Sequence, residues 1–229
     1  PLEAVAAIDT EDALWNWHAQ DPLRGDLRFF LTLVQDLQLQ RLGPGPGRYL
    51  SYGAYAQPGG GFALPGGVWR ADAMRLEAVD ATAITEDATH AWLADGAGPL
   101  HPLQGQTRPD PDKARGYTWN KAPRLRGEVV ETGAIARQLA SGHALVRDAV
   151  ARHGGNVYTR VLARVLELAR VVPMMEGWLG ALRPTEPFCV PSELPAEGSG
   201  MGLSEAARGS LGHWVVVKHG RIANYQIVA

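Results

Sequence analysis

The segment from Asn156 to about Leu182 constrains the fold of this chain most strongly, because its pattern predicts one long amphipathic helix. Its apolar residues recur at helical spacing and form a continuous stripe of Val157, Val161, Leu162, Val165, Leu168 and Val172. Such a stripe has to be buried against another part of the protein. Pro173 interrupts the segment and predicts a kink, because proline cannot donate a helical backbone hydrogen bond.

Four further helices are predicted from hydrophobic periodicity and from helix-start signals. They are expected over residues 1–20, 21–42, 80–93 and 134–153. The first contains Trp15 and Trp17. The second begins with Asp21-Pro22, a pair typical of an N-cap followed by a first-turn proline. Gly154-Gly155 ends the fourth, as glycine commonly does at the C-terminus of a helix.

Strands are predicted in two regions. Residues 68–79 favour a pair of short strands, and the apolar runs on either side of His219-Gly220 predict a β hairpin over residues 214–229. Segments rich in glycine and proline predict loops, with at most one short strand, over residues 48–67, 94–116 and 184–200. The predicted fold class is therefore α+β and mainly helical, with small β hairpins.

Composition and charge exclude several functions. The formal net charge of -2 gives no electrostatic basis for binding nucleic acid or an anionic membrane. No apolar run approaches the roughly 18 residues of a membrane span, so no transmembrane segment is predicted. The only cysteine of the sequence is Cys189, which excludes an internal disulfide and any metal site with several thiolates built by this chain alone.

The segment from Gly198 to Trp214 carries the most informative polar chemistry. Arg208 follows Ala207 and precedes a glycine, and further glycines precede it. Glycine lets a backbone approach a ligand closely, and a guanidinium offers several donors in a fixed planar fork. Such a turn could bring Arg208 close to a small buried ligand, with Glu205 orienting it or exchanging protons. A buried pair of arginine and glutamate that only stabilises the turn is the alternative.

The remaining polar residues are interpreted as structural. His213 is expected to be a hydrogen-bonded core residue, and Cys189 a small buried residue. Lys121 and Arg124 flank a proline-fixed turn and could recognise an anion, although a solvated loop that pairs with nearby carboxylates is the favoured interpretation. No metal site is predicted from the scattered histidines His90, His101 and His143. Taken alone, the residue chemistry leaves the chain an unassigned soluble domain.

Five short blocks resemble, in their order along the chain, the large nickel-bearing subunit of nickel–iron ([NiFe]) hydrogenases. They are Ile84-Thr-Glu-Asp-Ala-Thr-His-Ala-Trp92, His101-Pro-Leu-Gln-Gly-Gln-Thr107, Tyr117-Thr-Trp-Asn-Lys-Ala-Pro-Arg124, Glu131-Thr-Gly-Ala-Ile-Ala-Arg137, and Glu205 to Trp214 with Asn224-Tyr-Gln226. Each block alone is weak, but five in sequence are highly specific. The blocks that begin at Tyr117 and Glu131 are most similar to the hydrogen-sensing, regulatory branch of the family.

The resemblance implies the fold and the chemistry of that subunit. A helical core would carry a nickel ion held by four cysteine thiolates, two of them shared with an iron that binds carbon monoxide and cyanide. The substrate H2 would be split heterolytically, and electrons would pass to iron–sulfur clusters in a partner small subunit. A sensor would be cytoplasmic and could signal to a kinase. An uptake enzyme would lie at the periplasmic face of the membrane through its small subunit.

The resemblance also assigns roles to four residues near the end of the chain. Arg208 would lie against the cyanide ligands of the iron and the open coordination position, and Ala229 would line the same pocket. The carbonyl of Ile227 would bind a structural magnesium or similar ion. Glu205 would orient the turn. The family usually has proline before the arginine, where this chain has Ala207, so the turn is expected to be softer.

Residues 1–229 are accordingly interpreted as the central portion of such a large subunit. The two cysteine pairs that hold the metals in this family would lie outside the chain, one upstream and one downstream, and the chain alone would be inactive. The alternative is a metal-free scaffold related to a subunit of the quinone-reducing respiratory complex. A third interpretation is an unrelated helical domain with chance matches. The Glu205–Arg208 block favours the hydrogenase, because an arginine shaped for cyanide has no use without iron.

Overall fold

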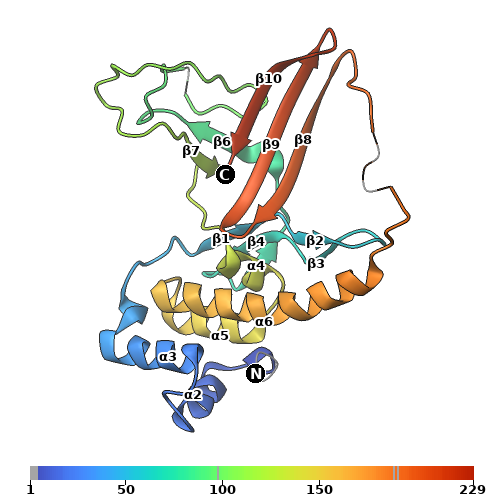
Figure 1. Ribbon diagram of the computed structural model, residues 1–229. Coiled ribbons are helices and arrows are strands. Elements are labelled where there is room, and N and C mark those ends of the chain that lie inside the picture. The colour runs from blue at the N-terminus through green and yellow to red at the C-terminus, as the bar shows by residue number, and fades with distance from the viewer. Residues whose placement is uncertain (1–4, 97, 188, 190) are drawn as a thin grey trace.

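The computed structural model describes the whole chain except residues 1–4, 97, 188 and 190. Figure 1 shows helices gathered at the end of the molecule that holds the N-terminus. A three-stranded antiparallel sheet projects at the opposite end, and short strands lie between the two. These parts are called here the helical region and the C-terminal sheet.

The helical region contains the longest element of the chain. The helices are α2 (Glu11–Ala19), α3 (Asp26–Leu37), α4 (Ala134–Ala140), α5 (Ala144–His153) and α6 (Val157–Ala181), with short 3-10 helices η1 (Leu39–Arg41) and η2 (Ala81–Ala83). The long helix predicted from the apolar stripe is confirmed as α6, which continues through Pro173. A capping box starts it: Asn156 Oδ1 accepts from the Thr159 amide at 3.1 Å, and Thr159 Oγ1 accepts from the Asn156 amide at 2.9 Å.

The strands form small antiparallel sheets and one longer sheet. They are β1 (Arg48–Ser51), β2 (Ala54–Ala56), β3 (Phe62–Leu64), β4 (Gly67–Arg70), β5 (Arg75–Glu77), β6 (Ile84–Asp87), β7 (Ala122–Leu125), β8 (Gly198–Ala206), β9 (Gly209–Lys218) and β10 (Arg221–Val228). One small sheet has the order β1-β4-β5, and two others pair β2 with β3 and β6 with β7. The C-terminal sheet has the order β10-β9-β8, and its register places Trp214 between Met201 and Gln226.

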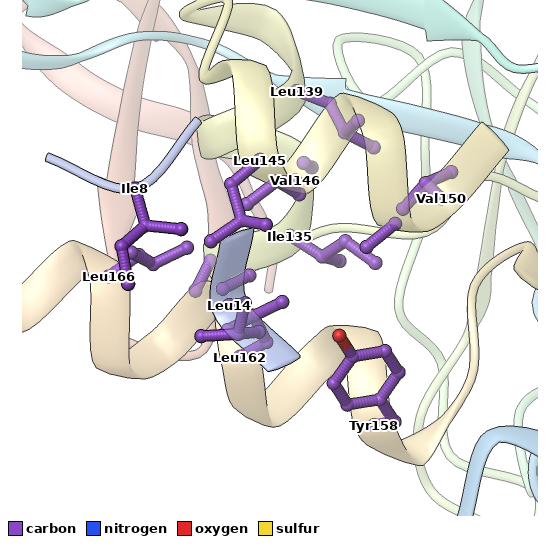
Figure 2. Close-up of a cluster of buried hydrophobic side chains, with 14 of the residues drawn as sticks. Ile8, Leu14, Ile135, Leu139, Leu145, Val146, Val150, Tyr158, Leu162 and Leu166 are labelled. Atoms are coloured by element: carbon purple, nitrogen blue, oxygen red, sulfur yellow. The ribbon is translucent and has the colours of Figure 1, made fainter. Parts of the chain in front are cut away.

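Two clusters of buried side chains hold these elements together. The helical core, part of which Figure 2 shows, packs α4, α5 and α6 against the N-terminal segments. Its members with no exposed surface include Leu14, Leu31, Leu139, Leu145, Leu162 and Leu166. The second cluster, called here the sheet core, comprises Leu50, Val68, Ile84, Leu125, Trp214 and Val228. Through Trp214 and Val228 the C-terminal sheet is anchored on the small sheets.

The balance of helix and strand differs from the prediction of a mainly helical chain. The described residues form five helices and ten strands, with 32% of residues in helix and 27% in strand, so the fold is mixed α+β. The difference arises where loops were predicted. Residues 48–67 contribute β1, β2 and β3, and the glycine-rich segment from Gly198 pairs with β9 over nine residues. Glycine lowers the strand preference of a segment, but pairing with a neighbouring strand overrides it here.

The helix predicted over residues 80–93 is wrong. Asp80 Oδ1 accepts hydrogen bonds from the amide and the hydroxyl of Thr82, at 3.1 and 2.6 Å, and closes a tight turn. Strand β6 follows at once and pairs with β7, with Ile84 opposite Leu125. Ile84 and Glu86 are buried while their neighbours are not, which is the period of a strand. An apolar residue at every fourth position was therefore not a helix signal here.

Two predicted helix boundaries are also corrected. The second helix begins at Asp26 rather than at Asp21, because Gly25 takes a φ of 81° that ends the preceding turn. The helix predicted over residues 134–153 is two helices, α4 and α5. Gly142 between them has a φ of 83°, a left-handed conformation that breaks the helical path.

Several predictions are confirmed. The helix with Trp15 and Trp17 is α2, although it begins only at Glu11, after the N-cap Thr10. The strand pair within residues 68–79 corresponds to β4 and β5, and the hairpin that turns at His219-Gly220 joins β9 to β10. In the described part of the chain, helices lack the combination of length and apolar character that crossing a membrane requires.

Candidate functional site

The turn between β8 and β9 carries the arginine that the sequence singled out. Ala206 pairs with Gly209, so Ala207 and Arg208 form the two-residue connection. Gly209 lies so close to Thr132 that any Cβ there would collide with the threonine side chain. A Cβ at Gly133 would lie 2.9 Å from the carbonyl oxygen of Arg208. The turn is therefore seated on the segment that leads into α4.

A buried arginine on α4 forms hydrogen bonds with the backbone of this turn. Arg137 is 2% exposed, and its Nη1 donates to the carbonyl of Ala206 at 2.8 Å while its Nη2 donates to that of Ala207 at 3.0 Å. Its Nε and Nη2 also donate to the carboxylate of Glu167, at 2.9 and 2.7 Å, and its Nη1 donates to Glu205 at 2.8 Å. The three charged side chains are called here the arginine clamp.

Glu205 belongs to this clamp and has a different partner from the one expected. Its side chain is almost fully buried, and Oε1 accepts from the amide of Tyr52 at 2.8 Å and from the hydroxyl of Ser210 at 2.7 Å. The buried pair of arginine and glutamate that the sequence allowed thus exists, but its arginine is Arg137. Glu205 therefore bonds Arg137 and not Arg208, and its role in orienting the turn stays a prediction.

The electrostatics of the clamp favour its charged form. Burial alone would lower the pKa of Arg137, but the hydrogen bonds and charges of Glu167 and Glu205 outweigh it and raise the pKa above its usual value. Burial and the neighbouring charge of Glu205 raise the pKa of Tyr52 to about 12. Both side chains therefore keep their ordinary protonation state near neutral pH.

Arg208 itself is exposed at the tip of the turn. Its guanidinium takes part in none of the hydrogen bonds or ion pairs found among the described residues, whereas Arg137 uses all of its donors. The predicted turn is present, and in this structure it carries Arg208 at the surface; that it brings Arg208 close to a small ligand stays a prediction. The backbone of the turn is held by Arg137 and by Gly133, whereas the side chain of Arg208 is exposed.

Ala229 lies near the same end of the C-terminal sheet. Val228 pairs with Gly212, so β10 ends beside the start of β9. Ala229 is exposed and borders a cavity of about 220 Å³ that Thr132 and Ser210 also line. Thr132 contacts the turn and Ser210 bonds Glu205, so this cavity adjoins the arginine clamp. The structure thus brings Ala229 into the neighbourhood of Arg208.

Ile227 belongs to a second cavity of about 350 Å³, which contains a buried charge cluster. Lys121 Nζ lies 3.3 Å from Glu86 Oε2 and donates to Gln226 Oε1 at 2.8 Å. Thr107 donates to the same oxygen at 3.0 Å. Burial raises the pKa of Glu86, and the adjacent ammonium of Lys121 opposes that rise. Oxygen donors of this kind suit a hard cation, although the ammonium already neutralises Glu86.

The donor set for a soft metal is different. Cys189 is exposed in the loop after α6, so the expectation of a small buried residue is wrong. Histidine, cysteine and carboxylate side chains of the described residues form no group of three that could hold a metal ion. With one thiol in the sequence, these residues do not fit the ligand set of a nickel–iron centre.

The other polar residues lie apart from the turn. His213 is half-buried on the C-terminal sheet, and its Nδ1 lies 2.5 Å from the hydroxyl of Tyr225, so it is hydrogen-bonded but outside the core. Lys121 is buried, which corrects the expectation of a solvated loop, whereas Arg124 donates to the carbonyl of Pro123 at 2.8 Å. Three other histidines have separate surroundings: His90 Nδ1 lies 3.4 Å from the carbonyl of Arg115, His101 Nε2 lies 3.3 Å from that of Ala81, and His143 is the N-cap of α5.

Sequence reasoning missed two members of the clamp, Arg137 and Glu167. A signal for Arg137 existed, because it is the only charged residue of a short helix whose seven residues are all buried. Charges are almost never fully buried unless they are paired, so its position demanded a partner. Glu167, on α6, carried no comparable signal.

Comparison with known proteins identifies the family. A family model described as nickel-dependent hydrogenase matches residues 23–229. The uptake hydrogenase large subunit of Azotobacter chroococcum is 30% identical over 78% of this chain, and that of Afipia carboxidovorans is 32% identical over 73%. The matches cover 39% and 36% of those relatives, so the chain spans well under half of their length.

Solved structures share the fold. A [NiFeSe] hydrogenase from Desulfovibrio vulgaris Hildenborough superposes with a TM-score of 0.75 at 26% identity, and the match covers 97% of this chain and 51% of that chain. The [NiFeSe] hydrogenase of Dm. baculatum gives a TM-score of 0.75 at 27% identity. The arrangement of the helical region and the C-terminal sheet is therefore one found in these proteins.

Proposed function

Since the chain belongs to the nickel-dependent hydrogenase family, we propose that it forms part of the large subunit of a [NiFe] hydrogenase, which splits H2 heterolytically into protons and electrons. The observation that carries the proposal is the arginine clamp, which holds an exposed arginine, Arg208, on a fixed turn. A guanidinium presented in this way can stabilise anionic ligands beside it, because its charge is permanent and its donors keep a planar fork.

In this proposal Arg208 and Ala229 would line the pocket that holds the iron and its diatomic ligands, and the guanidinium would offer its donors to the anionic cyanides. When bound, the nickel–iron centre with its carbon monoxide and cyanide ligands supplies the place where H2 is split. Its thiolate ligands come from the parts of the relatives' length that this chain does not match. The 229 residues alone supply the surroundings of the centre and are inactive.

A structural cation is a second element of the proposal. The carbonyl of Ile227 binds magnesium or a similar ion at the cavity that Glu86 and Gln226 also line. Carboxylate, amide and carbonyl oxygens are the donors that such hard cations prefer. Glu86 would then be shared between the ion and Lys121.

The partners follow from the same reaction. Electrons leave to iron–sulfur clusters in a small subunit. A protein that consumes H2 would lie at the periplasmic face of the membrane through that subunit. A hydrogen sensor, to which the blocks at Tyr117 and Glu131 are most similar, is cytoplasmic and signals to a kinase.

The test uses the protein purified from its native cell. Nickel and iron are measured by elemental analysis, and turnover by H2-dependent reduction of a viologen dye. We expect both metals in the wild type, and in Arg208→Lys a turnover lower by about 10²-fold or more with unchanged nickel, because lysine keeps the charge but loses the fork. Arg221→Lys is the matched control, since Arg221 is exposed at the other end of β10.

Two outcomes would contradict the proposal in different ways. A wild-type protein without nickel and without turnover favours the metal-free scaffold. An Arg208→Lys variant with wild-type turnover removes the role given to Arg208, while the family's chemistry stands.

A further inference from the structure

We propose that Arg137 is a positioning residue, which sets the backbone conformation of the Ala207–Arg208 turn and so the direction of the Arg208 side chain. The inference rests on the proposed function only where it concerns the reaction. The conformation of the turn itself can be tested without any metal. The basis of the inference is the set of contacts that Arg137 makes, the residues that hold the turn, and the donors of the guanidinium.

The guanidinium of Arg137 is saturated with acceptors. Its five N–H groups reach two carboxylates and two backbone carbonyls, at distances between 2.7 and 3.0 Å. The two carbonyls belong to Ala206 and Ala207, the residues directly before Arg208. The two N–H groups that the carboxylates leave unpaired are the ones that donate to these carbonyls, so the burial of the guanidinium is coupled to the conformation of the turn.

These two bonds restrain the backbone at one defined point. Because each peptide unit is planar, a bond to the Ala206 carbonyl orients the unit between residues 206 and 207, and a bond to the Ala207 carbonyl orients the next. Both soft dihedral angles of Ala207 lie between those two planes. Arg137 therefore fixes the angle at which the chain enters Arg208.

The far side of the turn is held by the same part of the molecule. The Arg208 carbonyl rests against Gly133, and Gly209 rests against Thr132. Gly133 is the N-cap of α4, and its carbonyl accepts from the Arg137 amide at 3.0 Å. The first turn of α4 is thus one rigid platform that touches the hairpin connection before and after Arg208.

Arg137 is in turn held by groups that cannot easily move. Glu167 comes from α6 and also accepts from Gln138 at 3.2 Å, while Arg170 donates to Gln138 at 2.6 Å. Glu205 is fixed by Tyr52 and Ser210. Hydrogen bonds between charged groups are short and strong when they are removed from water. The position of the turn is therefore transmitted from the helical region.

Lysine cannot take the place of Arg137. An ammonium has three donors and no planar fork, so it cannot satisfy two carboxylates and two carbonyls together. The backbone of the turn would lose its restraint while the charge of the clamp stayed the same. Arg137→Lys therefore separates positioning from charge.

The test compares Arg137→Lys with Arg160→Lys in the protein purified from its native cell. Arg160 is also bidentate to a glutamate, Glu131, and donates to a carbonyl, that of Gly43, at 2.6 Å. It takes no part in the clamp. Three quantities are measured: amide hydrogen exchange over residues 203–211, the infrared stretching bands of metal-bound cyanide, and H2-dependent dye reduction per nickel.

For Arg137→Lys we expect faster exchange in the turn, shifted cyanide bands and a turnover lower by about 10²-fold at unchanged nickel content, since a displacement near 1 Å has an effect of that size. Arg160→Lys should keep all three wild-type values. A nickel-loaded Arg137→Lys variant with wild-type exchange, bands and turnover would overturn the inference.

Glu205→Gln decides the matter if Arg137→Lys does not fold. The amide keeps the shape of the side chain but has one oxygen for the donors of Arg137, Tyr52 and Ser210. Faster exchange in the turn supports the inference, and unchanged exchange overturns it. If the wild type has no nickel and no cyanide band, the proposed function fails, and the exchange data alone still decide whether Arg137 positions the turn.

Discussion

The helical region and the C-terminal sheet bury their side chains in different ways. All seven residues of α4 are buried, and α6 buries one face of its N-terminal half. In contrast, β8 buries little besides the side chain of Glu205, and β10 buries only Gln226 and Val228. Figure 1 shows the sheet projecting from the body of the molecule. The helical region is a packed core, whereas the sheet depends on a few anchors.

The polar side chains of the candidate site lie where the helical region and the C-terminal sheet meet. The arginine clamp joins the two regions, with Arg137 and Glu167 from helices and Glu205 from β8. A turn on the sheet alone would be free to move, and a residue inside the helical core could not reach a ligand. Joining a rigid region to an exposed one gives a side chain that is accessible and still well placed.

The largest expected effect comes from the main anchor of the sheet. Trp214 is 1% exposed, lies in the sheet core and contacts His101 edge to face with ring centroids 6.2 Å apart. We expect Trp214→Ala to lower the free energy of unfolding by about 3–5 kcal/mol, because it leaves a large cavity. Urea denaturation followed by circular dichroism measures this. Trp119→Ala, at a site 54% exposed, is the control and should cost less than about 1 kcal/mol.

Amide hydrogen exchange tests whether the loss of stability in Trp214→Ala is confined to the C-terminal sheet. If the sheet depends on its anchors, Trp214→Ala should speed exchange in β9 more than in α6. Equal acceleration in both elements would mean that the two regions unfold as one unit. The contrast between them would then be one of exposure only.

The next effect concerns the helical core. Leu162 on α6 has no exposed surface, and we expect Leu162→Ala to cost about 2–5 kcal/mol in the free energy of unfolding. Leu179→Ala is a matched control on the same helix, since Leu179 is 68% exposed and alanine is at least as good a helix former. Urea denaturation of both variants makes the comparison. An equal loss in the free energy of unfolding for the two variants would contradict the assignment of a buried N-terminal half and an exposed C-terminal half to α6.

The elements that sequence alone predicted correctly are those whose pattern is local. The helix after Asn156 carries its own cap and apolar stripe, and the hairpin at His219-Gly220 carries its own turn residues. The segment from Asp80 failed because its strand exists only by pairing with residues about 40 positions later. Local periodicity cannot report such a partner.

The candidate site, like the fold, could be predicted only where its residues are close together in the sequence. The turn at Arg208 could be found because glycines and charges are concentrated in one short segment. The clamp could not, because Glu167, Glu205 and Arg137 are separated by 30 to 68 positions and meet only in the fold. The buried state of Lys121 was hidden for the same reason, since Glu86 lies 35 positions away.

The smallest expected effect is a pH dependence confined to the helical region. Arg152 on α5 donates to Asp12 on α2 at 2.6 and 3.2 Å, and this hydrogen bond and charge hold the pKa of Asp12 below its usual value. A carboxyl with a lowered folded-state pKa stabilises the protein above its ordinary pKa, near 4 for aspartate, and that contribution is lost as the pH falls through the lowered value.

We therefore expect Asp12→Asn to lower the melting temperature slightly at pH 7, and the difference from wild type to vanish as the pH falls through the lowered pKa of Asp12. Asp36→Asn is the control, because Asp36 is exposed on α3 and has no ion pair among the described residues, so its difference from wild type should stay small and constant. Exchange in β9 should not respond to Asp12→Asn. A response there, or a difference that grows toward acid, would mean that this surface pair couples the helical region to the C-terminal sheet.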